Sequence, residues 1–388
     1  MMAVTCTRLF GVSRHLLLLL TCLTAGRTAL PGQSLKLVFA GDIMVHDRQL
    51  RAAGQADGSY DFSSSFRYVA PLLQEADLAI GNLELTLPGH KPYAGYPHFR
   101  APDTLAGTLK EAGFDVLVTA NNHSNDSGRR GIWRTLEALA KRSLYYTGTF
   151  ADTLERDTTY PLLLQHQGYR LALLNYTYGT NDPHVPAPCF VNVIDTVQIK
   201  QDLAKARRLN PDLIIAYMHW GHEYHLDENE EQHQLAHQLF QWGADIIIGA
   251  HPHVIQPVRI LHDYREGQLR HGLVAYSLGN FISGQIKENT DLGLLLEIEL
   301  QRHPVTRAVA FRHHYIPVWR HRGYTATGRR TFTIIPVSAF AQKGQEVLSS
   351  PDRRAMLTVT RRLRKHLRRF NSSERVVSLS LWKNEKMP

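Results

Sequence analysis

A short apolar run that ends in two histidines is the feature that most constrains how this chain can fold. Ile246–Ile248 is β-branched throughout, which is typical of a buried strand. Two small residues end the run, and His251 and His253 follow with Pro252 stiffening the turn between them. Open α/β sheets bind ligands at the carboxyl ends of their strands. The pair is therefore either a candidate metal site or a turn in a histidine-rich chain.

Four other apolar runs also lead into side chains that bind metals. In chain order they are Leu35–Ala40 with Asp42, Leu78–Ile80 with Glu84, Asp115–Ala120 with Asn122 and His123, and Asp212–Met218 with His219. Each has an ordinary alternative: a Gly-Asp turn, a surface glutamate, a helix-capping turn or a half-buried histidine. The five runs together favour one shared site, because every donor comes just after a predicted strand.

Predicted helices alternate with these strands through most of the chain. They are Phe62–Leu73, Asp103–Ala112, Gly131–Lys141, Asp195–Arg208 and Asn229–Trp242. The other predicted strands are Leu162–Gln165 and Tyr169–Tyr176, which form a hairpin at Gln167-Gly168, and Leu273–Leu278, Leu294–Leu300 and Ala308–Val318. Residues His90–Pro102 and Asp182–Pro188 are predicted loops, because they are rich in proline. The alternation predicts a layered α/β fold.

The N-terminus has the pattern of a secretory signal in residues 1–30. Arg8 and Arg14 precede the apolar run Leu16–Leu20, and small residues follow. The apolar core is too short to span a bilayer comfortably, although an uncleaved anchor remains an alternative. We therefore expect an exported bacterial protein that is periplasmic or associated with the cell envelope. The formal net charge of +9 favours anionic partners, and nucleic acid is not among those expected.

The C-terminal part carries a strongly basic segment, Arg353–Phe370. Met356, Leu363 and Leu367 fall near helical spacing in it, so one face of the predicted helix is apolar. One interpretation is a helix packed on the domain with its basic face in solvent. The other is a helix that meets an anionic membrane surface or polymer. Residues 323–350, which precede it, show no clear periodicity.

The donors at the strand ends mix oxygen and nitrogen. Carboxylate, amide and imidazole ligands suit one or two divalent ions such as Mn, Zn, Fe or Mg, and do not resemble a thiolate site. Such ions can hold a phosphate-like group and lower the pKa of a bridging water. A remaining histidine could then protonate the leaving group.

Seven motifs together resemble the CapA family, the poly-γ-glutamate capsule synthesis proteins. They are Phe39–Met44, Gly81–Glu84, Phe99–Pro102, Ala120–Asp126 with Gly128, His219–Glu223, Gly249–Val254 and Ser277–Phe281. They occur in the family's order between about Leu35 and Leu300. The family looks like a branch of the calcineurin-like metallophosphoesterase superfamily, and the resemblance implies a four-layer α/β/β/α sandwich. It suggests a domain over residues 33–320 and a C-terminal extension with the basic helix over residues 321–388.

The resemblance also implies a role for each site residue. The implied metal ligands are Asp42, Glu84, Asn122, His219, His251 and His253. The implied catalytic residues at the leaving-group side are His123 and Asp126. The implied substrate-binding or supporting residues are Arg100, Glu223 and Asn280.

Two positions depart from the wider superfamily pattern. Met44 stands where Asp-x-His would place a histidine, with His46 shifted by two residues, and Glu84 replaces the usual bridging aspartate. We expect a metal-dependent hydrolase that cleaves a phosphoester, or an amide of a polyglutamate-like chain, in the synthesis, export or processing of an anionic envelope polymer. Met44 favours the alternative, a non-catalytic accessory that binds the polymer or a membrane-bound synthase. The pair Asn122 and His123 favours the enzyme. A phosphatase unrelated to capsule is a third interpretation.

Overall fold

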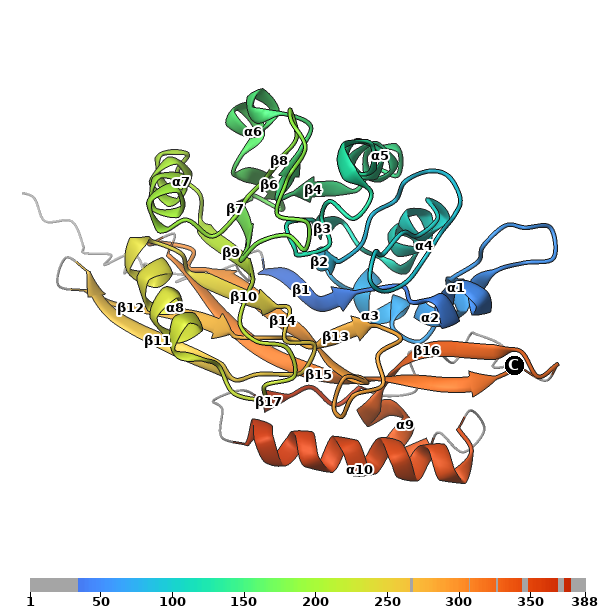
Figure 1. Cartoon of the computed structure of the whole chain (residues 1–388). Coiled ribbons are helices and arrows are strands. Elements are labelled where there is room, and N and C mark those ends of the chain that lie inside the picture. Colours follow the sequence, from blue (N-terminus) through green and yellow to red (C-terminus); the bar gives the residue numbers. More distant parts are fainter. Residues whose placement is uncertain are drawn as a thin grey trace, which may run out of the picture.

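Two large β-sheets lie face to face with helices outside them (Figure 1). The computed structural model describes residues 34–265, 268–306, 308–325, 327–343, 348–368 and 373–377. The predicted signal sequence, residues 1–30, lies outside the described residues.

The first sheet has nine strands within the described residues, in the order β16-β15-β14-β1-β2-β3-β4, with β13 beside β1 and β17 beside β15. Its strands are β1 (Ser34–Ile43), β2 (Leu78–Leu83), β3 (Val116–Val118), β4 (Tyr145–Thr147), β13 (Asn280–Ile282), β14 (Leu292–Arg302), β15 (Val309–Tyr324), β16 (Arg330–Pro336) and β17 (Ser373–Glu374). The strands β1, β2, β3 and β4 run parallel. Their carboxyl ends therefore meet at one edge region of the sheet.

The second sheet has the order β11-β12-β10-β9-β7-β6. Its strands are β6 (Leu162–His166), β7 (Tyr169–Thr177), β9 (Leu213–His219), β10 (Ile246–Ala250), β11 (Val258–Arg265) and β12 (Gln268–Ala275), and a small separate pair joins β5 (Thr149–Phe150) to β8 (Phe190–Val191). The neighbours β7, β9, β10 and β12 are parallel, so this sheet also gathers its carboxyl ends.

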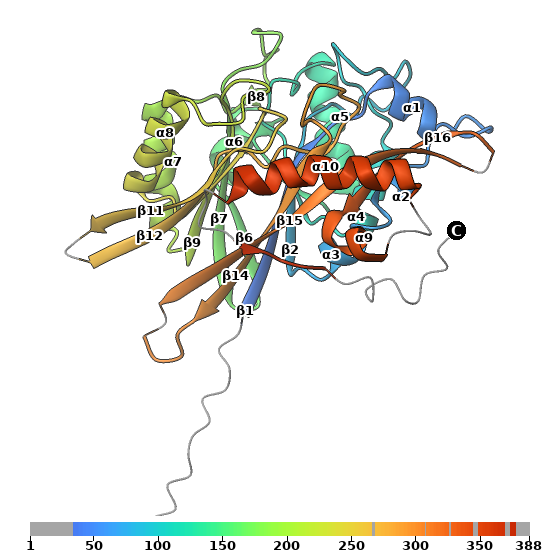
Figure 2. The same ribbon diagram turned by 90° about the horizontal axis from the view of Figure 1, so that it is seen from below.

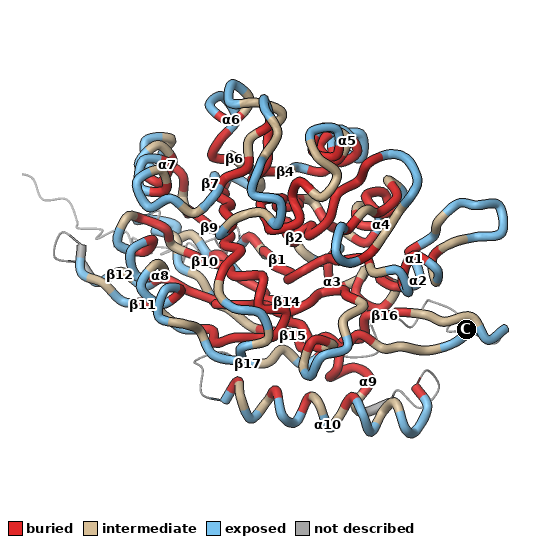
Figure 3. The backbone as a smooth tube through the Cα atoms, viewed as in Figure 1, coloured by how far each residue is buried: buried red, intermediate tan, exposed pale blue. Residues whose placement is uncertain are grey.

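Ten helices are described, and most cover the outer faces of the two sheets. They are α1 (Asp47–Ala53), α2 (Ser63–Phe66), α3 (Ala70–Gln74), α4 (Thr104–Ala112), α5 (Gly128–Lys141), α6 (Thr153–Thr159), α7 (Thr196–Arg208), α8 (Glu230–Trp242), α9 (Val337–Lys343) and α10 (Ser350–Leu367). Figure 3 shows the sheets as the buried interior, with exposed residues concentrated on the outward sides of the helices and in the loops.

The alternation of side chains along β9 explains the layering. Leu213, Ile215 and Tyr217 belong to the core shared with the first sheet. The residues between them pack with α7 and α8 on the other face. The Tyr217 hydroxyl crosses between the sheets and donates to the carbonyl of Ala40 at 2.6 Å. The predicted four-layer α/β/β/α sandwich is therefore confirmed.

Several predicted elements were wrong in detail. Gly41-Asp42 is not a turn, because β1 continues through Asp42 to Ile43 with an irregular register there. The single helix predicted over Phe62–Leu73 is two short helices, α2 and α3, separated by a turn. Pro71 lies in the first turn of α3, and inside a continuous helix it would remove a hydrogen bond and clash with the preceding turn.

The C-terminal region holds structure that its sequence did not reveal. Residues 323–350 contain β16 and α9, and β15 runs across residue 320, so the first sheet continues beyond it. The basic helix is present as α10, with Met356, Leu363 and Leu367 buried, while Arg369 and Phe370 lie outside the described residues. Figure 2 shows α10 lying across β15. None of the described helices is both long and apolar enough to cross a membrane.

Candidate metal centre

Five of the predicted ligands converge where the carboxyl ends of the two sheets face each other. Asp42 and Glu84 come from the first sheet, and the three histidines come from the ends of β9 and β10. The Nδ1 atom of His253 lies 2.9 Å from Asp42 Oδ2. Glu84 Oε1 lies 3.7 Å from His219 Nε2 and 3.8 Å from His253 Nε2. All of these side chains are buried.

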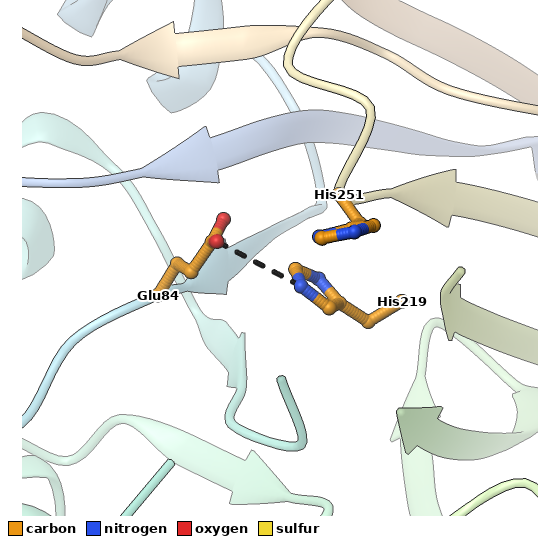
Figure 4. A group of neighbouring side chains, drawn as sticks. All are labelled: Glu84, His219 and His251. Atoms are coloured by element: carbon orange, nitrogen blue, oxygen red, sulfur yellow. Dashed lines mark ion pairs between the residues drawn. The ribbon is translucent and has the colours of Figure 1, made fainter. Parts of the chain in front are cut away.

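Donor atoms gather into three overlapping groups, in each of which the atoms lie within 4.8 Å of one another. The groups are Glu84 with His219 and His251, Asp42 with Glu84 and His253, and Glu223 with His251 and His253. Figure 4 shows the first group, with the Glu84 carboxylate and the two imidazole rings turned toward a common space. Glu84 belongs to two of the three groups, so one carboxylate could contribute to two neighbouring metal positions.

Two buried donor atoms at the centre have no hydrogen-bond partner among the described residues. They are Glu84 Oε1 and His251 Nδ1. A buried polar atom without a partner costs free energy, so its presence calls for an explanation. A divalent cation would satisfy both atoms, and the oxygen and nitrogen donor set suits such an ion. The residues therefore fit a divalent metal site.

Burial keeps His219 and His251 neutral. It lowers the pKa of His219 well below its usual value, and it lowers the pKa of His251 to about 3, with His253 adding to the effect. Neutral imidazole is the form that binds metal ions. Burial and the nearby Asp42 raise the pKa of Glu84 well above its usual range. Burial would also raise the pKa of Asp42, but the hydrogen bond from His253 brings it below the usual value.

The backbone that carries the two histidines is strained. His251 has φ of 95° and His253 has φ of 58°, and both values lie in the left-handed region. Residues other than glycine rarely adopt this region, and such strain is concentrated at functional sites. The turn between them is held in part by the carbonyl of Pro252, which accepts a hydrogen bond from the backbone N–H of Tyr224. Both rings contribute donor atoms to the groups described above.

Asparagines connect the two sheets at the edge of the centre. Asn122 Oδ1 lies 2.9 Å from His219 Nε2, so the sixth predicted ligand also reaches the site. Asn82 donates to Asp42 Oδ1 at 2.8 Å and lies 3.3 Å from His219 Nδ1. The segment around Asn122 is not the cap of the following helix, because the N-cap residue of α5 is Ser127. The capping explanation for Asn121–Asp126 is therefore wrong.

The predicted catalytic pair is preformed. His123 Nδ1 lies 2.7 Å from Asp126 Oδ2, and both side chains are buried. The same Asp126 oxygen accepts the backbone N–H of Phe99 at 2.6 Å, and the Phe99 ring packs edge-on against the imidazole. Asp126 thus fixes the orientation of the His123 ring.

Of the three predicted substrate-binding residues, Glu223 belongs to a donor group, whereas the other two do not. Glu223 lies at the opening of the centre, with Oε1 at 3.9 Å from His253 Nε2. Asn280 stands opposite Asp42 in register, but its amide donates to Gln285 and to the carbonyl of Thr290. Arg100 has a buried Nε without a hydrogen-bond partner among the described residues, and no contact brings it into the metal-ligand groups.

His46 does not take the place of the histidine that Met44 replaces. Its ring packs against Phe99, and its Nδ1 accepts the backbone N–H of Gly284 at 3.0 Å. Met44 itself is buried in the core. Among the described residues, neither belongs to a donor group. One potential metal ligand of the wider superfamily pattern is therefore missing from this chain.

Sequence reasoning missed three residues that border the centre. Tyr178 packs its ring 4.6 Å from that of His251 and remains half exposed. Asn181 places its amide nitrogen within 3.4 Å of both His123 ring nitrogens, and Asn82 links Asp42 to His219. Tyr178 is the first residue after β7, so an inspection of the residues that follow this strand would have indicated it.

The family model for the bacterial capsule synthesis protein PGA_cap matches residues 36–285. The chain belongs to this family. The capsule biosynthesis protein CapA of Bacillus anthracis is 31% identical over 280 residues, which are 69% of this chain and 64% of that protein. The PGA biosynthesis protein CapA of Bacillus subtilis (strain 168) is 29% identical over 276 residues, 69% of this chain and 68% of that protein. This chain thus spans about two thirds of the length of these two relatives.

Two solved structures with a related backbone share much less of the sequence of this chain. The calcineurin-like phosphoesterase YfkN from Bacillus subtilis is 14% identical, with a TM-score of 0.41 over 74% of this chain and 91% of that one. The sulfate thiohydrolase SoxB of Thermus thermophilus is 13% identical, with a TM-score of 0.42 over 87% of this chain and 62% of that one.

Proposed function

We propose that this protein is a metal-dependent hydrolase that acts on an anionic capsule or cell-envelope polymer of the poly-γ-glutamate type, in its synthesis, export or processing. The observation that carries the proposal is the buried Glu84 Oε1 atom, which has no hydrogen-bond partner in the described part of the chain but is surrounded by His219 and His253. Membership of a capsule synthesis family supports the polymer as substrate.

Asp42, Glu84, Asn122 and the three histidines at the ends of β9 and β10 would hold the ion or ions. A divalent ion bound there would lower the pKa of a coordinated water and polarise the bond to be cleaved. Mn, Zn, Fe and Mg all fit the donor set. Glu223, which is partly exposed beside His253, borders the opening through which substrate would enter.

In this proposal His123 acts as the general acid. In its imidazolium form, Nδ1–H donates to Asp126, which leaves Nε2–H for the leaving group. Phe99 and Asp126 hold the ring in place, so little reorganisation is needed when a substrate binds. The reaction would be cleavage of a phosphoester, or of an amide in a polyglutamate-like chain.

A second candidate function is a non-catalytic accessory that binds the polymer or a membrane-bound synthase. Met44 favours it, because the histidine of the wider superfamily pattern is missing and His46 packs elsewhere. In that case metal would be structural or absent. We further propose that the protein is exported and that exposed cations of α10 meet an anionic membrane surface. Several arginines of this helix instead pair within the protein, such as Arg364 with Glu374.

The test combines metal analysis with hydrolysis assays. Purified protein supplied with Mn²⁺ is assayed on bis(p-nitrophenyl) phosphate and on poly-γ-glutamate. We expect bound metal and turnover in the native protein, and a loss of about 10²–10⁴-fold in His123→Ala with metal retained. His237→Ala, on the outer helix α8, is the matched control and should turn over normally. No turnover on either substrate with one metal or none would favour the accessory.

A further inference from the structure

An arginine cluster lies on helix α1 and on the β15–β16 ribbon. We define it as Arg48 and Arg51 on α1, Arg320 and Arg322 on β15, and Arg330 on β16. Arg48, Arg51 and Arg330 line a cavity of about 450 Å³. Figures 1 and 2 both show α1 beside β16, at the end of the molecule away from α7. Residues far apart in the sequence thus build one basic surface.

The three ribbon arginines project from the same face. In the register of the ribbon, Tyr324 pairs with Arg330 and Arg322 pairs with Phe332. Side chains alternate between the faces of a strand, so Arg320, Arg322 and Arg330 share one side. Burial lowers the pKa of Arg322, and the neighbouring Arg48 and Arg330 contribute to this shift while Asp291 opposes it. The guanidinium groups are therefore close enough to repel one another.

No described carboxylate contacts the cluster directly, although Asp291 acts on Arg320 and Arg322 from a longer distance. Among the described residues, none of its five arginines has a carboxylate oxygen within 4.0 Å, whereas other arginines, such as Arg302 with Asp212, form ion pairs. Arg320 is the sharpest case, because it is 3% exposed and its Nε and Nη1 have no hydrogen-bond partner in the described structure. Its Nη2 donates to the carbonyl of Gln285, but two of its three nitrogens stay unsatisfied by the described residues. Buried donors without acceptors are costly, and an anion supplied by a ligand would compensate nearby guanidinium charge.

Arg329 contrasts with its neighbour Arg330. Its guanidinium donates to the backbone carbonyls of Ala52, at 2.6 Å, and Gly54. This arginine attaches the ribbon to the end of α1 and so fixes the shape of the cavity. Arg330 donates only to the Tyr324 hydroxyl among the described residues, at 2.6 Å, which leaves most of its donors available.

Two residues, Gln285 and Tyr224, separate the ribbon arginines from the candidate metal centre. Arg320 and Arg322 both donate to the carbonyl of Gln285, at 2.9 and 3.2 Å. The Gln285 amide reaches the Tyr224 hydroxyl at 3.4 Å, and the Tyr224 ring lies 6.1 Å from that of His253. A chain molecule bound at the metal centre would have to pass over these two residues to reach the arginines.

We propose that the arginine cluster binds the carboxylates of a polyanionic chain that extends from the metal centre. The inference rests on the proposed function for the identity of the polymer. Guanidinium groups bind carboxylates through paired hydrogen bonds, so neighbouring arginines would bind successive acidic residues of the polymer. A flexible polymer fits this place better than a membrane does, because Arg48, Arg51 and Arg330 line a cavity that a chain can enter and a flat surface cannot.

The test measures binding of fluorescein-labelled poly-γ-glutamate by anisotropy at 50 and 200 mM salt. The variants are Arg48→Gln with Arg322→Gln, and separately Arg320→Met. Arg208→Gln, an exposed arginine on the distant α7, is the matched control. We expect the double variant to bind about tenfold more weakly at 50 mM salt, with a shallower salt dependence, and the control to bind as the native protein does. The double variant changes two side chains that are not fully buried, so it tests the proposal even if Arg320→Met fails to fold.

Each outcome separates this inference from the proposed function. Equal affinity in the native protein and the double variant overturns the arginine site, whether or not hydrolysis is seen. Arginine-dependent binding without hydrolysis supports the site and counts against the hydrolase. Labelled polyphosphate is the second probe: arginine-dependent binding of polyphosphate, with none of poly-γ-glutamate, would overturn the assignment to a polycarboxylate.

Discussion

Replacing Glu84 by glutamine should weaken metal binding at both donor groups that contain this residue. Glu84 belongs to two of the three donor groups, whereas Glu223 belongs to one. Glutamine keeps the size of the side chain and the oxygen near Asn82, so the fold should survive. It removes the negative charge that attracts a cation. We therefore expect less bound metal and no stabilisation of this variant by added Mn²⁺.

The magnitude follows from linkage between binding and folding. An ion present at 100 times its Kd adds about 2.7 kcal/mol to the stability of a protein that binds it only when folded. In a large domain 1 kcal/mol raises Tm by about 2 °C, so native protein should gain about 5 °C on adding Mn²⁺ and lose it on adding EDTA. The Glu84→Gln variant should show no such change. Differential scanning fluorimetry with elemental analysis measures both effects.

Without metal, the native protein should no longer be more stable than the Glu84→Gln variant. Burial and Asp42 raise the pKa of Glu84 in the folded state, so the folded protein holds this proton at pH values where the unfolded chain has released it. Stability of the metal-free native protein then falls as the pH rises from about 4.3 toward the raised pKa. Glutamine does not titrate, and metal-free Glu84→Gln should be at least as stable as metal-free native protein at pH 8.

Glu111→Gln, an exposed position on α4, is the matched control and should behave as the native protein in every measurement. The reasoning about the centre would be refuted if Glu84→Gln kept its full metal content and the same Mn²⁺-dependent rise in Tm.

Three further changes test other parts of the structure. His251→Ala and His253→Ala should each lower the bound metal measured by elemental analysis, and an unchanged stoichiometry in both would contradict the ligand assignment. Asp202→Ala should destabilise the fold by about 3–5 kcal/mol in urea titrations, because it removes the close, buried carboxylate partner of the Arg156 guanidinium; a loss under 1 kcal/mol would count against this. Changing Arg354 and Arg361 on α10 to glutamine should weaken binding to anionic liposomes at low salt without altering metal content, and equal binding would make the basic face only structural.

The strand ends of this chain could be predicted from its sequence because the pattern there is local. Each apolar run is short, and a metal-binding side chain follows it closely, so the sequence alone indicates Glu84, His219 and His251 as ligands. Parallel strands bring their carboxyl ends together, which placed these residues at one edge. The exact ends of the strands were harder, since Asp42 continues β1 through an irregular register that no residue pattern marks.

Other features depend on contacts between distant segments. The arginine cluster joins α1 to a ribbon that lies near the other end of the chain, and no periodicity links them. The helix predicted over Phe62–Leu73 was wrong because its amphipathic spacing was given more weight than Pro71. His46 lies two residues from the position of the superfamily's histidine, but its ring packs against Phe99.

The origin of the donors has a kinetic consequence. Asp42 and Glu84 belong to one sheet, and His219, His251 and His253 belong to the other. An ion held by both sets would act as a cross-link between the sheets, and its release would break bonds to both sheets at once. Metal exchange should therefore be slow and should accelerate under the same mild denaturant that speeds hydrogen exchange in β1 and β10. The lifetime of the ion would then report how often the sandwich opens.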